Sequence, residues 1–262
     1  LAVADHGLEP WQREELERVG VIWLEHTKPE TDLTTIRQYS VSDPFAWWKP
    51  WICTATPFEE SVWVDSDAVI VGNITPCFEM LTKADWVSTE YAWGGDERQL
   101  YADVLRYIYV DALTIDDLHP TINKVNTGFL GWTKGSSNID EWRTIAQTLL
   151  RDTEALRWCR VRDQTAFFLL LVQHYHFANR YDPILIVDEK WNYPADGLPS
   201  AVAFMRRPVS RDPVELLQQA KQRHPGVLVV HWLGGPKPWD LRPVRTYADR
   251  IRPEDIGVFA PK

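Results

Sequence analysis

The chain has 262 residues with 28 basic and 37 acidic side chains, which gives a formal net charge of −9. This acidic balance argues against a general nucleic-acid-binding protein, because such proteins neutralise phosphates with lysine and arginine. The longest unbroken apolar run, residues 166–172, is far shorter than the roughly 20 residues that cross a bilayer. We therefore expect no transmembrane segment and no nucleic-acid partner.

Apolar runs alternate with helical patterns along the chain. Strands are expected at residues 1–4, 21–24, 61–64, 86–88, 126–133 and 227–232, with shorter pieces at 184–187 and 201–205. Helices are expected at residues 10–19, 44–55, 139–150, 163–173 and 214–222. This alternation predicts an α/β fold with a mainly parallel sheet, flanking helices and a small antiparallel part. Without repeats or linkers, residues 1–262 are expected to form a single domain.

The cysteines bear on the cellular compartment. Cys53, Cys77 and Cys159 are scattered and form no CxxC pair, which excludes a disulfide scaffold and a cysteine zinc site. Few cysteines suit a reducing compartment, and the first residues do not read as a secretory leader. We therefore expect a cytoplasmic protein.

Two carboxylates follow the apolar strand at residues 61–64. Asp65 and Asp67 are spaced i, i+2, so an extended backbone aims both side chains the same way. Ligands of open α/β sheets bind beyond the carboxyl ends of strands, and a divalent cation would relieve the repulsion between two acids. Mg²⁺ and Mn²⁺ prefer oxygen ligands, so this pair is a candidate metal site. A surface turn with two solvated acids is the alternative.

A histidine and a glycine-rich loop end the strand at residues 227–232. His231 could supply a third ligand to an ion such as Mn²⁺. Gly234 permits close approach of the backbone to a phosphate, and Lys237 adds positive charge there. Taken alone, His231 would be interpreted as a hydrogen-bonded histidine at the end of a strand.

Two further segments carry polar groups at the ends of elements. Asn126 and Gly128 begin the strand at residues 126–133, where the side-chain amide of Asn126 could donate a hydrogen bond to a sugar hydroxyl. Asp163 and Gln164 begin a helix that is apolar all round and therefore buried. An isolated aspartate at that position would be interpreted as a helix N-cap.

These segments together resemble the glycogenin-like family of retaining glycosyltransferases, which have the GT-A (Rossmann-like) fold. The order DxD, Asn-x-Gly, Asp-Gln and His-x-x-Gly-x-x-Lys-Pro-Trp matches that family. The last motif is matched at each specified position, by His231, Gly234, Lys237, Pro238 and Trp239. The resemblance covers residues 2–239, and the sequence similarity is weak between the motifs.

The resemblance implies a transferase that uses a nucleotide sugar, with uridine as the usual base, and a Mn²⁺ or Mg²⁺ ion. Asp67 and His231 would ligate the metal, and Asp65 would ligate it or touch the ribose. Lys237 and Gly234 would hold the diphosphate. The acceptor would be a hydroxyl of a glycan, a lipid-linked sugar or a small molecule.

The resemblance also assigns residues around the donor sugar. Asn126, Gly128 and Asp163 would orient it, and Gln164 would lie near the anomeric carbon. Gln164 is neither a strong nucleophile nor a base. It fits the hypothesis of a front-face reaction in which the leaving phosphate takes the acceptor proton.

Other residues are weaker candidates. Lys49, ahead of the DxD strand, could approach the donor or could be a surface lysine with a packed stem. Asp188 and Trp191 resemble the short Trp-Asn segment that borders the acceptor cleft of the family.

The chain holds 14 tryptophans, an excess that simple core filling does not require. At least seven lie in motif segments, so we interpret the excess as the wall of a carbohydrate cleft. Trp48, Trp191 and Trp239 are the first acceptor-binding candidates, whereas Trp63 and Trp232 are expected in the core.

The resemblance has one departure. In the family, a strand that forms much of the base pocket precedes the one that residues 1–4 resemble. Either that strand lies upstream of residue 1, or the base is held differently. A catalytically inactive GT-A domain that binds sugar nucleotides or glycans is therefore the main alternative. A nucleotidyltransferase is disfavoured because no glycine-rich basic loop follows an early strand.

Overall fold

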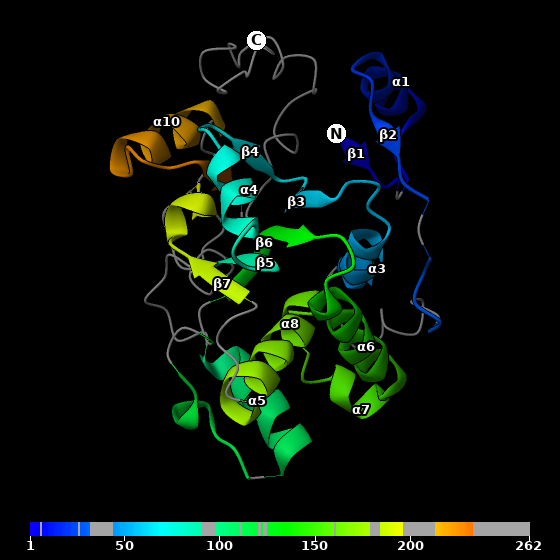
Figure 1. Cartoon of the computed structure of the whole chain (residues 1–262), viewed down its shortest axis with the longest axis vertical. Coiled ribbons are helices and arrows are strands. Elements are labelled where there is room, and N and C mark those ends of the chain that lie inside the picture. Colours follow the sequence, from blue (N-terminus) through cyan, green and yellow to red (C-terminus); the bar gives the residue numbers. More distant parts are fainter. Residues whose placement is uncertain are drawn as a thin grey trace. The chain divides into compact units, whose positions relative to one another are not determined.

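The computed structural model describes residues 1–5, 7–25, 27–31, 44–90, 98–110, 112–119, 122, 125–159, 161–178, 184–195 and 213–232. The chain divides into two compact units, each built from segments that are distant in the sequence (Figure 1). The first unit comprises Leu1–Ser61, Arg98–His119 and Thr133–Tyr181, and the second comprises Val62–Glu97, Pro120–Trp132 and Asp182–Lys262. A single domain over residues 1–262 stays a prediction.

The first unit begins with two short parallel strands joined by a helix. β1 (Ala2–Val3) pairs with β2 (Ile22–Trp23), and α1 (Pro10–Arg18) connects them. Proline occupies the first turn of α1, and the side chain of Gln12 accepts a hydrogen bond from the backbone N–H of Glu9 at 2.9 Å. Both features stabilise a helix start. The predicted order of strand, helix and strand is confirmed here.

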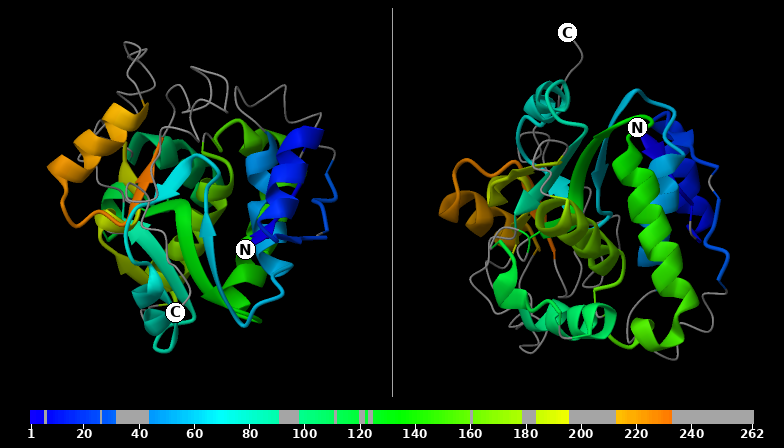
Figure 2. Two further views of the ribbon diagram at one scale, coloured as in Figure 1. Left: turned by 90° about the horizontal axis from the view of Figure 1, so that it is seen from above. Right: turned by 60° about the horizontal axis from the view of Figure 1, so that its bottom comes forward.

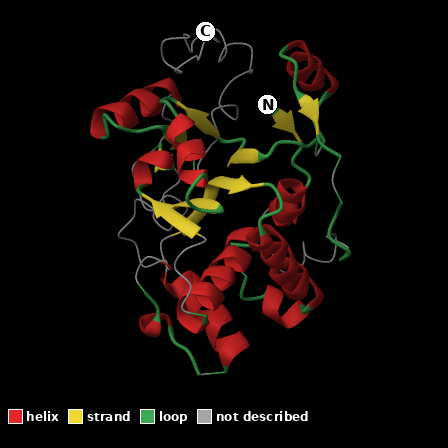
Figure 3. Cartoon of the chain, in the orientation of Figure 1, coloured by secondary structure: helices red, strands yellow, loops and turns green. Residues whose placement is uncertain are grey.

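The remainder of the first unit is mainly helical in its described part (Figure 3). Its elements are the 3-10 helix η1 (Pro44–Trp48), α3 (Lys49–Thr54), α5 (Arg98–Tyr109), the 3-10 helix η2 (Ile115–Asp117), α6 (Ser137–Arg151), α7 (Thr153–Leu156), α8 (Asp163–Leu171) and the π-helical η4 (Val172–Phe177). All residues of α8 are buried, as its apolar pattern predicts. Trp142 of α6 meets Phe167 edge-on, and Tyr101 of α5 stacks on Phe168. These contacts pack the middle of α8 against α5 and α6.

The second unit carries most of the strands. Its elements are β3 (Glu60–Val64), whose first two residues end the first unit, β4 (Ala68–Ile70), α4 (Thr75–Leu81), β5 (Trp86–Glu90), β6 (Val125–Thr133), β7 (Ile184–Val187), the 3-10 helix η5 (Glu189–Trp191), β8 (Tyr193–Pro194), α10 (Pro213–Arg223) and β9 (Val229–His231). One sheet has the order β3-β6-β5-β7 and another has the order β4-β9-β8. These strands can be followed from two further sides in Figure 2.

The sheets are mixed in strand direction. β5 pairs antiparallel with β6 and parallel with β7, while β9 pairs antiparallel with β4 and parallel with β8. The α/β class is confirmed, but the prediction of a mainly parallel sheet is not borne out by the described strands. The prediction assumed βαβ crossovers throughout. β5 and β6 are separated by α5 and nevertheless pair antiparallel, so a helix between two strands does not make them a parallel pair.

Tryptophan is mainly a core residue in the described structure. Seven indoles are buried: Trp47, Trp51, Trp86, Trp132, Trp142, Trp191 and Trp232. Trp191 is 4% exposed and packs against Phe129 at a centroid distance of 5.5 Å. Such a ring leaves little surface for a sugar to stack on. Of the tryptophans in the motif segments, Trp47, Trp51 and Trp191 are thus core residues rather than an exposed cleft wall.

The described helices include none that is long and apolar enough to cross a membrane.

We predict that the three cysteines of the folded protein react slowly with thiol reagents. Cys53, Cys77 and Cys159 are free and buried, and burial raises the pKa of the Cys159 thiol to about 12. Because the thiolate is the reacting form, a thiol reagent such as DTNB should modify only a small fraction of the native protein. All three should react in guanidinium chloride. Rapid stoichiometric labelling of the folded protein would contradict this prediction.

Candidate active site

Two carboxylates lie in the turn between β3 and β4. The backbone N–H of Asp65 donates to the carbonyl of Gly128 in β6 at 2.9 Å, and the N–H of Ala68 donates to the carbonyl of Asp65 at 3.0 Å. The carbonyl of Asp67 accepts the N–H of Trp232, directly after β9, at 2.9 Å. The turn is therefore anchored to two strands, and both side chains are half-buried rather than solvated.

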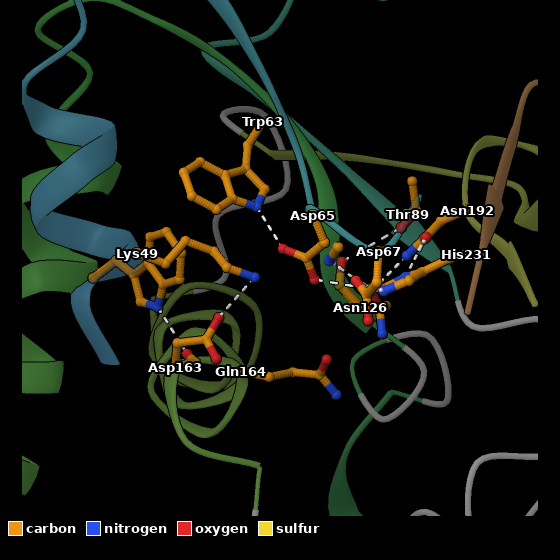
Figure 4. A network of polar contacts seen from close by, with 12 residues as sticks. Lys49, Trp63, Asp65, Asp67, Thr89, Asn126, Asp163, Gln164, Asn192 and His231 are labelled. Carbon is orange, nitrogen blue, oxygen red and sulfur yellow. Dashed lines mark hydrogen bonds and ion pairs between the residues drawn. The ribbon is translucent and has the colours of Figure 1, made fainter. Parts of the chain in front are cut away.

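His231 is brought to these carboxylates by strand register. It is the last residue of β9, and its Cα partner in β4 is Ala68, the residue next to Asp67. The ring Nε2 lies 2.9 Å from Oδ1 of Asp67 and 3.7 Å from Oδ2 of Asp65. The predicted grouping of the three residues is confirmed (Figure 4).

The donor set of this group fits a divalent cation. One ligand atom from each of Asp65, Asp67 and His231 can be chosen so that all lie within 4.8 Å of one another. Two carboxylate oxygens and one imidazole nitrogen suit Mn²⁺ or Mg²⁺. A ring lone pair and a carboxylate oxygen would repel at 2.9 Å, so a metal ion or a ring proton must lie between them. The three residues can therefore hold a metal, whose identity the residues do not fix.

Trp63 orients the first carboxylate. Its indole N–H donates to Oδ1 of Asp65 at 2.6 Å, and Oδ2 is the oxygen nearer to His231 (Figure 4). Its side chain is half-buried, so Trp63 is not one of the fully buried residues of the core in which it was expected. The expectation holds for Trp232, which is 4% exposed.

Two buried asparagines lie behind His231. Nδ1 of His231 is 2.9 Å from Oδ1 of Asn192, and Nδ2 of Asn192 donates to Oδ1 of Asn126. The same Asn126 oxygen accepts the N–H of Gly128 at 2.6 Å. Asn126 and Asn192 are each 3% exposed. Asn126 thus accepts hydrogen bonds from two groups inside the protein. Its contact with a donor sugar stays a prediction.

Gly128 makes room for the histidine ring. A Cβ at this position would lie 2.5 Å from Cε1 and 2.6 Å from Nδ1 of His231. These distances are below any ordinary contact between non-bonded carbon or nitrogen atoms. Glycine is therefore required here by close packing, which is a different reason from the predicted contact with a donor.

Replacing Gly128 with alanine should displace His231. We expect a loss of about 1–3 kcal/mol in the free energy of unfolding, because extra atoms in a packed interior force neighbours to shift. Mn²⁺ binding should weaken in parallel. Denaturant unfolding and titration calorimetry measure both effects. Gly226→Ala is the matched control, since a Cβ there would meet its nearest atoms at 3.9 Å. Equal stability of the two variants would contradict the packing argument.

The first unit contains a second polar group at the start of α8. Nζ of Lys49 lies 3.2 Å from Oδ2 of Asp163, and the side chains are 8% and 7% exposed. The indole N–H of Trp142 donates to the carbonyl of Asp163 at 3.0 Å. Lys49 is thus not the surface lysine that the sequence allowed. Its approach to a donor stays a prediction.

The backbone before this group is in an uncommon conformation. Arg162, the residue ahead of α8, has a φ of 50° and a ψ of −115°, where L-residues are rarely found. Asp163 follows as the first residue of α8 rather than its N-cap. Gln164 donates from Nε2 to the hydroxyl of Tyr101 at 2.7 Å and is 6% exposed. Its place near an anomeric carbon stays a prediction.

The remaining candidates are placed in different surroundings. Asp188 caps η5 by accepting the N–H of Lys190 at 3.3 Å and pairs with the Lys190 ammonium at 3.0 Å. Trp48 is half-buried, with Nζ of Lys28 at 5.1 Å from its ring centroid. Gly234, Lys237 and Trp239 lie outside the described residues.

Three residues of these groups were not singled out from the sequence. Asn192, Tyr101 and Trp142 each bond to a candidate residue. Asn192 could have been found, since it belongs to the Trp-Asn segment noted for its resemblance. Tyr101 and Trp142 lie on helical core faces, where nothing in the sequence pattern separates them from packing residues.

No protein-family model and no curated protein matches the sequence. Among solved structures, the apo crystal structure of mouse xyloside xylosyltransferase 1 is similar, with a TM-score of 0.50 and 12% identity over 88% of this chain and 82% of that chain. A glycosyltransferase involved in glycosylation of the major capsid of PBCV-1 has a TM-score of 0.43 and 14% identity over 88% and 90% of the two chains. The first likeness shows a fold similar to that of a glycosyltransferase, and it concerns the fold alone.

Proposed function

We propose that this protein is a metal-dependent, retaining glycosyltransferase that moves a sugar from a nucleoside diphosphate sugar to a hydroxyl acceptor. The observation that carries the proposal is the convergence of Asp65, Asp67 and His231 from two paired strands. The fold likeness and the motif order add support. UDP-sugars are the proposed donors, and the cytoplasm is the proposed location.

The reaction creates negative charge on the departing diphosphate. A bound Mn²⁺ or Mg²⁺ ion supplies positive charge that stabilises this leaving group. Asp65 and Asp67 would hold the ion through carboxylate oxygens, and His231 through Nε2. Lys237 and Gly234 are proposed, from their motif, to hold the diphosphate.

The donor sugar develops positive charge as the bond to the diphosphate breaks. Carboxylate and amide oxygens near the ring stabilise such an oxocarbenium-like centre. We assign this role to Asp163, with Gln164 beside the anomeric carbon, and Lys49 keeps the Asp163 carboxylate in place through their ion pair. The roles of Asp163 and Gln164 are proposed from the family resemblance.

The proposed acceptor contacts come from the sequence motifs. Trp48, Asp188 and Trp239 remain proposed acceptor contacts. The burial of Trp191 makes it a supporting residue of the core beneath that segment.

Donor cleavage tests the proposal directly. The protein is incubated with Mn²⁺ and a panel of UDP- and GDP-sugars, and released nucleoside diphosphate is measured. A xylose donor belongs in the panel because the mouse enzyme of similar fold is named for xylosyl transfer. We expect metal-dependent release with at least one donor, abolished by EDTA. With an acceptor found by screening, NMR of the product should show a retained anomeric configuration.

Binding without turnover is the contrary outcome. A protein that binds a donor tightly with Mn²⁺ but releases no diphosphate under any condition would be a sugar-nucleotide-binding module. The enzyme proposal would then be rejected.

A further inference from the structure

Of the two buried asparagines behind His231, Asn126 is predicted to contact the donor sugar, whereas Asn192 has no role in the proposed transfer reaction. Burying two amides costs free energy unless their hydrogen bonds are satisfied. A chain of such bonds therefore holds its side chains in one defined arrangement. The bonds run from the N–H of Gly128 through Asn126 and Asn192 to Nδ1 of His231. We refer to Asn126 and Asn192 as the amide relay.

The polarity of the amide relay follows from its first bond. A backbone N–H can only donate, so the Asn126 atom that faces Gly128 is its oxygen. Asn192 must then present its NH₂ group to that oxygen, and its own oxygen faces Nδ1 of His231. An amide oxygen can only accept. Nδ1 therefore carries a proton, and the ring presents Nε2 to the carboxylates.

Strand pairing holds Asn192 at the ring independently of the side-chain bonds. Its backbone N–H donates to the carbonyl of Glu189 at 3.0 Å, which closes η5. Two residues later, Pro194 of β8 pairs in register with His231 of β9, and the N–H of Ala195 donates to the carbonyl of His231 at 2.9 Å. The asparagine is thus fixed beside the histidine by the backbone.

We propose that Asn192 is a positioning residue that holds His231 with Nδ1 protonated and Nε2 directed at Asp65 and Asp67, so that the ring is preset to bind a divalent cation. This inference rests on the metal site of the proposed function but not on the transfer reaction. Partners that orient a metal-bound histidine commonly change metal affinity 10–100-fold. We expect Asn192→Ala to weaken Mn²⁺ binding by about that factor.

The variant is compared with a matched control. Asn138→Ala removes another buried asparagine, which belongs to α6 of the other unit and is 1% exposed. Mn²⁺ affinity is measured by titration calorimetry and by electron paramagnetic resonance, and folding is verified by thermal melting. Weaker binding by Asn192→Ala with unchanged binding by Asn138→Ala supports the proposal. Unchanged affinity in a folded Asn192→Ala variant overturns it.

A measurement on the unaltered protein decides the case if Asn192→Ala does not fold. In protein with ¹⁵N-labelled histidine and saturating Mg²⁺, long-range ¹H–¹⁵N spectra report which ring nitrogen carries the proton. His231→Gln identifies the His231 signals. A protonated Nδ1 and an unprotonated Nε2 support the proposal, and the opposite tautomer overturns it. Since neither readout uses a donor, a failed transfer assay with intact metal binding rejects the enzyme proposal alone.

Discussion

Replacing Asp67 with asparagine should lower metal-dependent donor cleavage by at least about 100-fold, since ion-stabilised leaving groups contribute several kcal/mol to the transition state. Asp67 is central because its Oδ1 is the carboxylate oxygen at 2.9 Å from Nε2 of His231. An amide keeps the shape of the side chain and its backbone anchor but removes the negative charge. We therefore expect Mn²⁺ affinity to fall with activity, while the unfolding transition keeps its cooperativity.

Glu79→Gln is the control for the loss of one negative charge. Glu79 is an exposed residue of α4 in the same unit. This variant should retain the Mn²⁺ affinity and the cleavage rate of the unaltered protein. If Asp67→Asn keeps its metal dependence and its rate, the assignment of the metal site fails even if the protein proves to be a transferase.

Replacing Lys49 with methionine should destabilise the fold by about 3–5 kcal/mol, the range for breaking a buried ion pair from one side. Methionine fills a similar volume, but it leaves the carboxylate of Asp163 buried without its partner at 3.2 Å. Most domains are stable by only about 5–15 kcal/mol, so such a loss is easily measured by guanidinium unfolding.

The double variant Lys49→Met/Asp163→Leu separates charge burial from packing. With both charges removed, much of the lost stability should return, because an apolar pair needs no compensation for desolvation. The double variant should still lack the activity that we assign to Asp163. A loss below about 1 kcal/mol in Lys49→Met would show that the ion pair is exposed to solvent, as a surface pair contributes at most that much.

The metal group was predictable because each residue ends an apolar strand. Asp65 and Asp67 follow one strand and His231 closes another, so the sequence places all three at strand ends. That they meet depends on β4 and β9 pairing antiparallel, which no local pattern encodes. The family resemblance, rather than strand periodicity, linked them in advance.

Other features depend on which face a side chain occupies after packing. Lys49 was open to two interpretations, because a lysine stem packs equally well at a surface or beside a buried acid. Trp63 was expected in the core and Trp191 in a cleft, but Trp63 is only half-buried whereas Trp191 is 4% exposed. Nearness to a motif in the sequence does not determine the direction of an indole.

The contact between Asp67 and His231 joins positions 164 residues apart in the chain. A chain that has not yet brought β9 to β4 therefore cannot possess the metal group, because His231 comes 164 residues after Asp67. Closing so long a loop has an entropic cost, and contacts of this range form slowly. A cation that binds only the paired strands would stabilise the completed structure by mass action. Metal affinity is thus also a measure of whether β4 and β9 have paired, and it reports the folding of this protein without a donor or an acceptor.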